Sequence, residues 1–237
     1  MRCASRRTAV IVRNREDHRP IPSWPDHEVR HAAESDRVQL HLEVDSQLVG
    51  AVVDRPASDR GAGGPAEHEV SGEIIRAADH DIKPGVTSDE GPGDAWPALR
   101  RKILAADILL IGTPIWLGQP SSICKRVLER MDAFLEETDD EGRMISFGRV
   151  AAVAVAVVGN EDGAHHVSAE IFQALNDVGF TIPAGAVTYW VGEAMGNTNY
   201  IDLAKTPEAV QKATATLARN TAHLARLLSK HQYPGGD

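Results

Sequence analysis

Two short segments of this chain combine residue types that suit a flat, polar ligand. The first, TPIWLGQPSS at residues 113–122, sets Trp116 among two prolines and a glycine, which make a stiff, wide turn with backbone N–H groups on display. The second, GNEDG at residues 159–163, runs directly into a helical pattern. Apolar side chains in such loops can cover the face of a planar ring while backbone amides bond its carbonyl and nitrogen atoms. The two segments therefore predict a site for a flat heterocycle.

These residues also have plainer interpretations. Trp116 could be a core or interface aromatic, and the Asn-Glu-Asp run could be an ordinary capping loop, since Asp is a favoured N-cap. The pair His165-His166 and the run Asp79-His80-Asp81 invite a metal-binding interpretation. Adjacent residues on a helix point in different directions, however, which disfavours a paired ligand set.

Both segments follow runs that have the pattern of buried strands. Residues 107–112 (DILLIG) and 149–158 (RVAAVAVAVV) are continuously apolar or nearly so, as in strands buried on both faces of a parallel sheet. Apolar residues at helical spacing predict helices, with Asp94 as an N-cap and Gly179 as a C-cap. The expected helices are 94–106, 121–135, 164–178 and a last one opened by Thr206-Pro207, and further strands are expected at 72–78 and 182–191.

The alternation of strands and helices predicts an α/β fold, a doubly wound parallel sheet with helices on both faces. Right-handed crossovers place the ligand site of such a sheet at the carboxyl ends of its strands. Both segments lie directly after a predicted strand, so both are expected at that edge.

The runs TPIWLGQPSS…KRVLERMD and GNEDG, at this separation, resemble the NAD(P)H-dependent FMN reductase family of the flavodoxin-like superfamily, from about residue 70 to 230. The resemblance implies a flavodoxin-like fold, FMN as cofactor and hydride transfer from NADPH or NADH to flavin N5. Electrons would then pass to a quinone, a nitro or azo compound, a metal or free flavin, with no dedicated catalytic acid or base. The residues implied to bind the cofactor are Thr113, Pro114, Ile115, Trp116, Leu117 and Gly118 from the first segment and Gly159, Asn160, Glu161, Asp162 and Gly163 from the second.

Composition narrows the class of protein further. A net charge of −9 argues against nucleic acid and anionic membranes as partners, and no apolar stretch approaches the ~20 residues that span a bilayer. Cys3 and Cys124 form no CxxC motif, which excludes a disulfide framework and a zinc knuckle. Cys124 is expected to be a small core residue, and Arg126, Glu129 and Arg130 are expected to form a solvated helix face. The expectation is a cytoplasmic homodimer or homotetramer that meets a nicotinamide and a small electron acceptor.

The first 66 residues do not match the family. They contain ten arginines and no lysine, with short apolar runs at 8–12, 38–44 and 48–53. No strand there leads into the Ser/Thr-rich loop and helix that hold the FMN phosphate in the family. A Gly61-x-Gly63-x-x-Ala66 spacing fails as a dinucleotide motif because Pro65 interrupts it and no strand precedes it.

We therefore expect residues 1–69 to be an atypical segment, disordered or misframed in the coding DNA, and residues 70–232 to be a flavodoxin-like FMN-binding domain. The first strand and the phosphate loop stay open, with residues 38–44 or 48–53 as candidates for the missing strand. Two other functions also stay open. The chain could be an electron carrier or redox-sensing flavin module without turnover, or a defective family member that binds no flavin.

Overall fold

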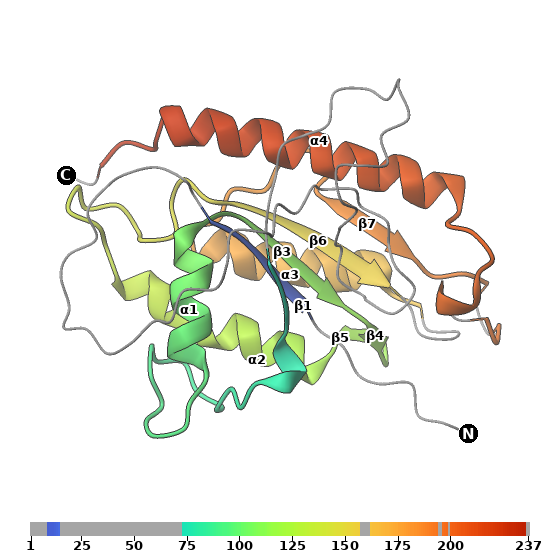
Figure 1. The fold of residues 1–237 in the computed structure, drawn as a ribbon, viewed down its shortest axis with the longest axis horizontal. Coiled ribbons are helices and arrows are strands. Elements are labelled where there is room, and N and C mark those ends of the chain that lie inside the picture. The colour runs from blue at the N-terminus through green and yellow to red at the C-terminus, as the bar shows by residue number, and fades with distance from the viewer. Residues whose placement is uncertain (1–8, 15–72, 157–161, 194–195, 199, 236–237) are drawn as a thin grey trace, which may run out of the picture.

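The structure, a computed structural model, describes residues 9–14, 73–156, 162–193, 196–198 and 200–235 (Figure 1). Its main sheet contains β1 (Ala9–Asn14), β2 (Glu73–Arg76), β3 (Ala106–Thr113), β6 (Val150–Ala156) and β7 (Val187–Trp190), and a separate pair contains β4 (Ile115–Trp116) and β5 (Gln119–Pro120). The α-helices are α1 (Trp96–Ala105), α2 (Ser122–Arg130), α3 (Ala164–Asp177) and α4 (Glu208–Lys230). The domain boundary expected near residue 70 falls outside the described residues and stays a prediction.

The strand order of the main sheet is β2-β1-β3-β6-β7. β3 runs parallel to β6, with Leu110 opposite Ala152, and β6 runs parallel to β7, with Val153 opposite Val187. Helices pack on both faces of this sheet (Figure 1). The predicted doubly wound α/β fold is therefore confirmed, with one departure at β1, the second strand of the sheet.

The departure is that β1 runs antiparallel to both of its neighbours. The sequence had predicted a wholly parallel sheet. A parallel connection needs a crossover of a dozen or more residues, usually a helix, and no such pattern follows residues 9–14. An antiparallel strand needs no crossover, since Val12 pairs with Glu73 at the start of β2. Residues 9–14 thus form the strand between β2 and β3, and the two candidate runs 38–44 and 48–53 lie outside the described residues.

The reversal of β1 also decides which end of it faces the ligand edge. Ala9 pairs with Gly112, near the carboxyl end of β3, whereas Asn14 pairs with Ala106 at the other end. The chain therefore leaves β1 at the edge opposite the predicted site. A loop placed directly after this strand cannot lie where the family holds the FMN phosphate.

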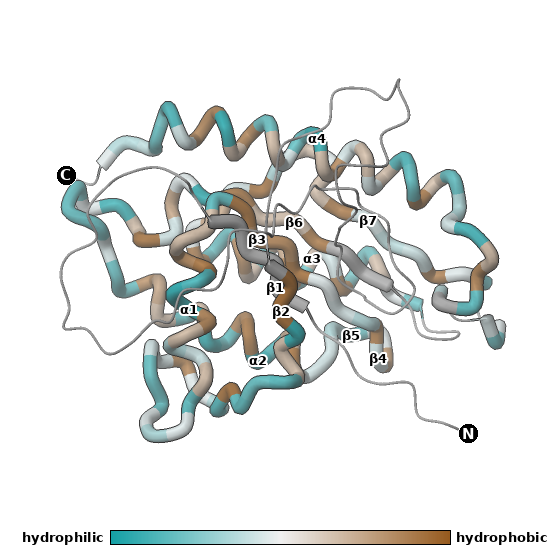
Figure 2. Tube along the Cα trace, viewed as in Figure 1, coloured by the Kyte–Doolittle hydropathy of each residue, from teal (hydrophilic) through white to brown (hydrophobic). Residues whose placement is uncertain are grey.

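Alternate residues of the strands build two apolar layers, one on each face of the sheet. Leu109 and Ile111 join α1, α2 and α3 in the larger cluster, while Ile108 and Leu110 pack with α4. This period of two is what a strand buried on both faces requires, because successive side chains point to opposite faces. Figure 2 shows the apolar strands between helices whose outer surfaces are polar.

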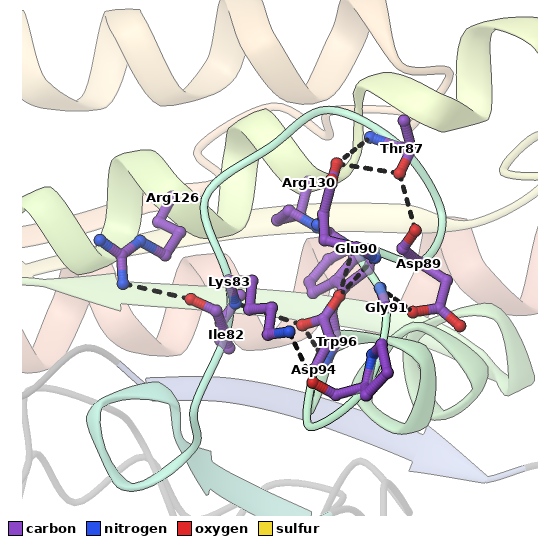
Figure 3. Close-up of polar contacts among 11 residues, drawn as sticks. Ile82, Lys83, Thr87, Asp89, Glu90, Gly91, Asp94, Trp96, Arg126 and Arg130 are labelled. Carbon is purple, nitrogen blue, oxygen red and sulfur yellow. Dashed lines mark hydrogen bonds and ion pairs between the residues drawn. The ribbon is translucent and has the colours of Figure 1, made fainter.

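The helix face around Arg130 differs from expectation. Glu129 is exposed as predicted, but Arg130 is fully buried and its Nη2 lies 2.7 Å from Asp94 Oδ2, itself fully buried. Arg126 is half-buried and donates to the carbonyl oxygen of Ile82 at 3.1 Å. The prediction of a solvated face was wrong for both arginines because the segment 82–95 runs over this side of α2, as Figure 3 shows.

Asp94 is the centre of that segment. Its carboxylate accepts hydrogen bonds from the backbone N–H groups of Lys83, Glu90 and Trp96 at 3.2, 3.0 and 3.1 Å. Burial alone would raise the pKa of Asp94, but these three hydrogen bonds and the charge of Arg130 outweigh it, so the pKa is lowered. The N-cap of α1 is therefore Ala95 and not the predicted Asp94, whose carboxylate instead accepts from the first N–H of the helix and pairs with α2.

Candidate functional site

The first predicted loop is a tight β-hairpin. β4 and β5 pair with Ile115 opposite Pro120 and Trp116 opposite Gln119, so only Leu117 and Gly118 lie in the turn. Both turn residues have positive φ, 52° for Leu117 and 74° for Gly118. Positive φ at both central positions is the mark of a type I′ turn, whose twist matches that of the flanking strands. The stiffness expected from the prolines is therefore reinforced by strand pairing.

Hydrogen bonds fasten the base of the hairpin to the core. The buried Thr113 hydroxyl accepts from the backbone N–H of Ser121 at 3.2 Å and donates to the carbonyl of Pro114 at 3.0 Å. Ser121 in turn caps α2, because its side chain accepts from Cys124 N at 3.1 Å. The end of β3 and the start of α2 are thereby held together beneath the loop.

Cys124 lies fully buried in the apolar cluster at this position. Burial raises the pKa of its thiol to about 12. The prediction that Cys124 is a core residue is confirmed.

Only the tip of the hairpin offers side chains to a ligand. Thr113, Pro114 and Ile115 are buried, so they can contribute backbone groups but no side-chain surface. Trp116 is half-buried, and Leu117 is 90% exposed at the turn. A large apolar side chain that combines this exposure with a positive φ is unusual in a soluble domain. Such a residue is more often retained for a contact than for folding.

The second predicted loop meets the first one. Gly159, Asn160 and Glu161 lie outside the described residues, but Asp162 and Gly163 are described. Gly163 has a φ of 114°, and a Cβ atom placed on it would lie 3.1 Å from the carbonyl oxygen and 3.2 Å from the Cα of Gly118. The two glycines therefore pack against each other without side chains between them. This contact brings both predicted segments to one place at the carboxyl edge of the sheet.

Gly163 does not present a free amide there, since its N–H donates to Asp162 Oδ1 at 2.6 Å. The backbone conformation of Gly163 positions α3, whose first residue is Ala164.

The start of α3 also holds two neighbouring elements. His166 Nε2 lies 2.9 Å from Gln119 Nε2 on β5, and His165 Nε2 lies 2.8 Å from the Tyr189 hydroxyl on β7. The adjacent histidines thus face different partners. No feature of the sequence pattern indicated a partner for Gln119. Tyr189 could have been selected because it lies near the carboxyl end of the predicted strand 182–191.

The described residues at this edge fit a flavin ring. Among them we find no Ser/Thr-rich loop of the kind that holds the FMN phosphate in the family. A Cβ on Gly163 would crowd its contact with Gly118, and the hairpin tip offers the exposed apolar surface that a planar ring needs. On the phosphate side, β1 leads away from this edge. The geometry of the described residues is therefore compatible with the predicted ring contacts, which stay a prediction.

Comparison with known proteins shows the family of this chain. The profile of the family described as NADPH-dependent FMN reductase matches residues 57–196. The 8-demethyl-8-aminoriboflavin-5'-phosphate synthase of Streptomyces davaonensis is 33% identical over 171 residues, 68% of this chain and 66% of that protein. The crystal structure of RosB with the bound intermediate 8-demethyl-8-formylriboflavin-5'-phosphate superposes with a TM-score of 0.61 at 33% identity, covering 68% of this chain and 67% of that one.

A second relative carries a different name. The divalent metal cation transporter MntH of Mycobacterium bovis is 37% identical over 177 residues, which is 72% of this chain and 26% of that protein. The chain thus spans about a quarter of this relative and just under two thirds of the synthase. In the part of the chain that the structure describes, no helix has the length and apolar composition needed to cross a bilayer.

Proposed function

Because this chain belongs to the NADPH-dependent FMN reductase family, we propose that it is a flavin-dependent oxidoreductase. In this proposal it takes hydride from NADPH or NADH and delivers electrons to a small acceptor such as a quinone, a nitro or azo compound, a metal or free flavin. The observation that carries the proposal is the contact between Gly118 and Gly163, which joins the two ring loops at the carboxyl edge of the sheet.

The hairpin would supply one face and one edge of the ring site. Trp116 and Leu117 offer apolar surface to the ring, and the buried residues 113–115 hold that surface in place. The loop that ends at Asp162 and Gly163 would approach from the other side, with Gly159, Asn160 and Glu161 as further proposed contacts. When bound, a flavin supplies hydride acceptance and electron release, so the protein needs no dedicated acid or base for that chemistry. The residues of this chain bind the ring, orient it and exclude water from one of its faces.

The proposal is tested by purifying the full chain and measuring its visible spectrum. Absorption bands of bound oxidised flavin, followed by steady oxidation of NADPH or NADH with a quinone or ferricyanide, are expected. Bound flavin that is reduced only by a partner reductase would favour an electron carrier instead. A colourless protein that takes up neither FMN nor riboflavin would contradict the proposal.

A second candidate function treats the flavin as substrate. The 33% identity to 8-demethyl-8-aminoriboflavin-5'-phosphate synthase favours it, since the name of that relative is a reaction on the flavin ring itself. Mass spectrometry of the flavin after prolonged incubation separates the two cases. A flavin recovered with unchanged mass supports the reductase, and a flavin with an altered 8-substituent supports ring modification.

We also infer that the protein works as a homodimer or homotetramer in the cytoplasm. The support is the family resemblance. Light scattering on the purified chain measures the assembly, and fractionation of cells that express it measures the compartment.

A further inference from the structure

His165 and Tyr189 form a bonded pair at the carboxyl edge, outside the residues assigned above to the ring. His165 is the second residue of α3, and Tyr189 is the last but one of β7. The His165 Nε2 atom lies 2.8 Å from the Tyr189 hydroxyl oxygen, and the rings meet edge to face with centroids 5.0 Å apart. Two different contacts between the same side chains fix the hydroxyl oxygen in one position.

The pair lies beside the ring loops. Gly163, two residues before His165, packs on Gly118 of the hairpin, and the next residue, His166, bonds Gln119 of the same hairpin. Tyr189 pairs in register with Val155, one residue before the end of β6, where the second loop begins. Tyr189 therefore lies at the same edge of the sheet as the two loops.

The chemistry of the pair selects a class of ligand. A phenol can donate one hydrogen bond while its oxygen accepts another. With the proton on His165 Nε2, the imidazole donates to the phenol oxygen, and the hydrogen of Tyr189 is left for a ligand. Such a donor suits an uncharged carbonyl oxygen, because it offers neither the positive charge that binds an anion nor the carboxylate that binds a metal ion.

We propose that Tyr189, oriented by His165, donates a hydrogen bond to the carbonyl oxygen of a quinone-type electron acceptor. The proposal rests on the function proposed above and narrows its acceptor to planar aromatic carbonyl compounds. Ferricyanide has no carbonyl oxygen and needs no such donor. Tyr189 is thus a specificity residue for the acceptor, and His165 is a positioning residue that acts through it.

The test compares Tyr189→Phe with wild type in the flavin-loaded protein. Duroquinone is the probe, since its four methyl groups block reaction with thiols, and its dissociation constant is measured by fluorescence titration of the oxidised protein without any nicotinamide. Loss of one neutral hydrogen bond predicts a dissociation constant and a KM about three- to tenfold higher. The KM for ferricyanide and the dissociation constant of the flavin are expected to stay unchanged.

Two further variants control the interpretation. Tyr200→Phe removes a hydroxyl that bonds Thr206 at 3.2 Å, and it should leave duroquinone binding unchanged. His165→Gln keeps an N–H donor and should lose less affinity for duroquinone than His165→Phe. The proposal is overturned if Tyr189→Phe binds duroquinone as wild type does, or if the KM values for duroquinone and ferricyanide rise equally. If wild type oxidises no nicotinamide, the proposed function fails, and the titration still decides whether Tyr189 binds quinones.

Discussion

Arg130→Met should destabilise the protein strongly although it touches no part of the ring site. Arg130 is fully buried, and its ion pair with Asp94 at 2.7 Å joins two side chains that are both shielded from water. A second carboxylate, Glu90, lies 3.3 Å away and is partly exposed. The Arg130 guanidinium also lies 5.8 Å from the centroid of the Trp96 ring. Methionine can fill much of the aliphatic volume of the arginine but leaves the Asp94 charge buried without its partner.

Removing one member of a buried ion pair usually costs 3–5 kcal/mol of unfolding free energy, because the charge left behind stays uncompensated. Two features here favour the lower end of that range. Asp94 keeps its three backbone hydrogen bonds, and among the described residues Arg130 Nε has no hydrogen-bond partner that would be lost. We therefore expect a loss of about 3 kcal/mol.

The assay is urea unfolding followed by circular dichroism, with Arg126→Met as the matched control. Arg126 lies one turn earlier on α2, is half-buried and makes one bond to the carbonyl of Ile82, so its replacement should cost about 1 kcal/mol. If Arg126→Met proves as costly as Arg130→Met, then burial of the Arg130–Asp94 pair is not what stabilises this region.

The same pair predicts a dependence on pH. The pKa of Asp94 in the folded protein lies below its ordinary value of 3.8. A lowered pKa means that its stabilisation is fully present above that value and is lost as the pH falls through the folded pKa. In Arg130→Met the carboxylate loses a positive neighbour, so its pKa rises and acid unfolding should begin at a higher pH. Acid titrations of both proteins that coincide would contradict this account of Asp94.

Three further predictions concern the ring site. Trp116→Ala should weaken flavin binding by about 1–3 kcal/mol, the usual contribution of an aromatic side chain stacked on a base-like ring; equal dissociation constants in a flavin titration would remove Trp116 from the site. Gly163→Val must accommodate a φ of 114° and a Cβ 3.1 Å from the Gly118 carbonyl, so flavin occupancy measured by absorbance should fall while helical content changes little. Finally, FMN and riboflavin should bind with affinities within about tenfold of each other, because each charge-assisted phosphate bond would contribute about 1.5–3 kcal/mol and the described residues offer no family loop for them. Calorimetric titration that finds FMN bound far more tightly would show that another part of the chain builds a phosphate site.

The sequence was sufficient for the features that depend on local periodicity. The continuous apolar runs predicted β3 and β6, and the hairpin after β3 meets Gly163 because a doubly wound sheet gathers the loops after its strands at one edge. The direction of β1 could not be read in this way. The four apolar residues 9–12 satisfy a ladder in either direction, and the pairing of β1 with β2 and β3 fixes it. The segments 38–44 and 48–53 lie outside the described residues, so the expectation that one of them contributes a strand stays a prediction.

Arg130 shows the second limit of sequence reasoning. Its position on α2 predicts a side chain beyond the apolar stripe, which is normally solvated. Burial came instead from a segment nearly forty residues earlier, whose acidic residue Asp94 had already been interpreted as a helix cap. An aspartate before a helix that also pairs with a buried arginine has the same sequence pattern as an aspartate that only caps a helix. The pairing of Gln119 with His166 was missed for the same reason, since it joins a hairpin to a helix across 47 positions.

The antiparallel course of β1 makes the chain between β1 and β2 a natural site for protein engineering. Val12 and Glu73 are direct partners in the ladder, so the strands enter and leave at neighbouring points of one edge. Residues directly opposite each other in such a pair lie about 4.5–5.5 Å apart, a gap that a two-residue turn closes as well as a long insertion does. The loops after β3 and β6 lie at the other edge. A reporter domain inserted between β1 and β2 would therefore be attached at the edge of the sheet opposite the hairpin and Gly163.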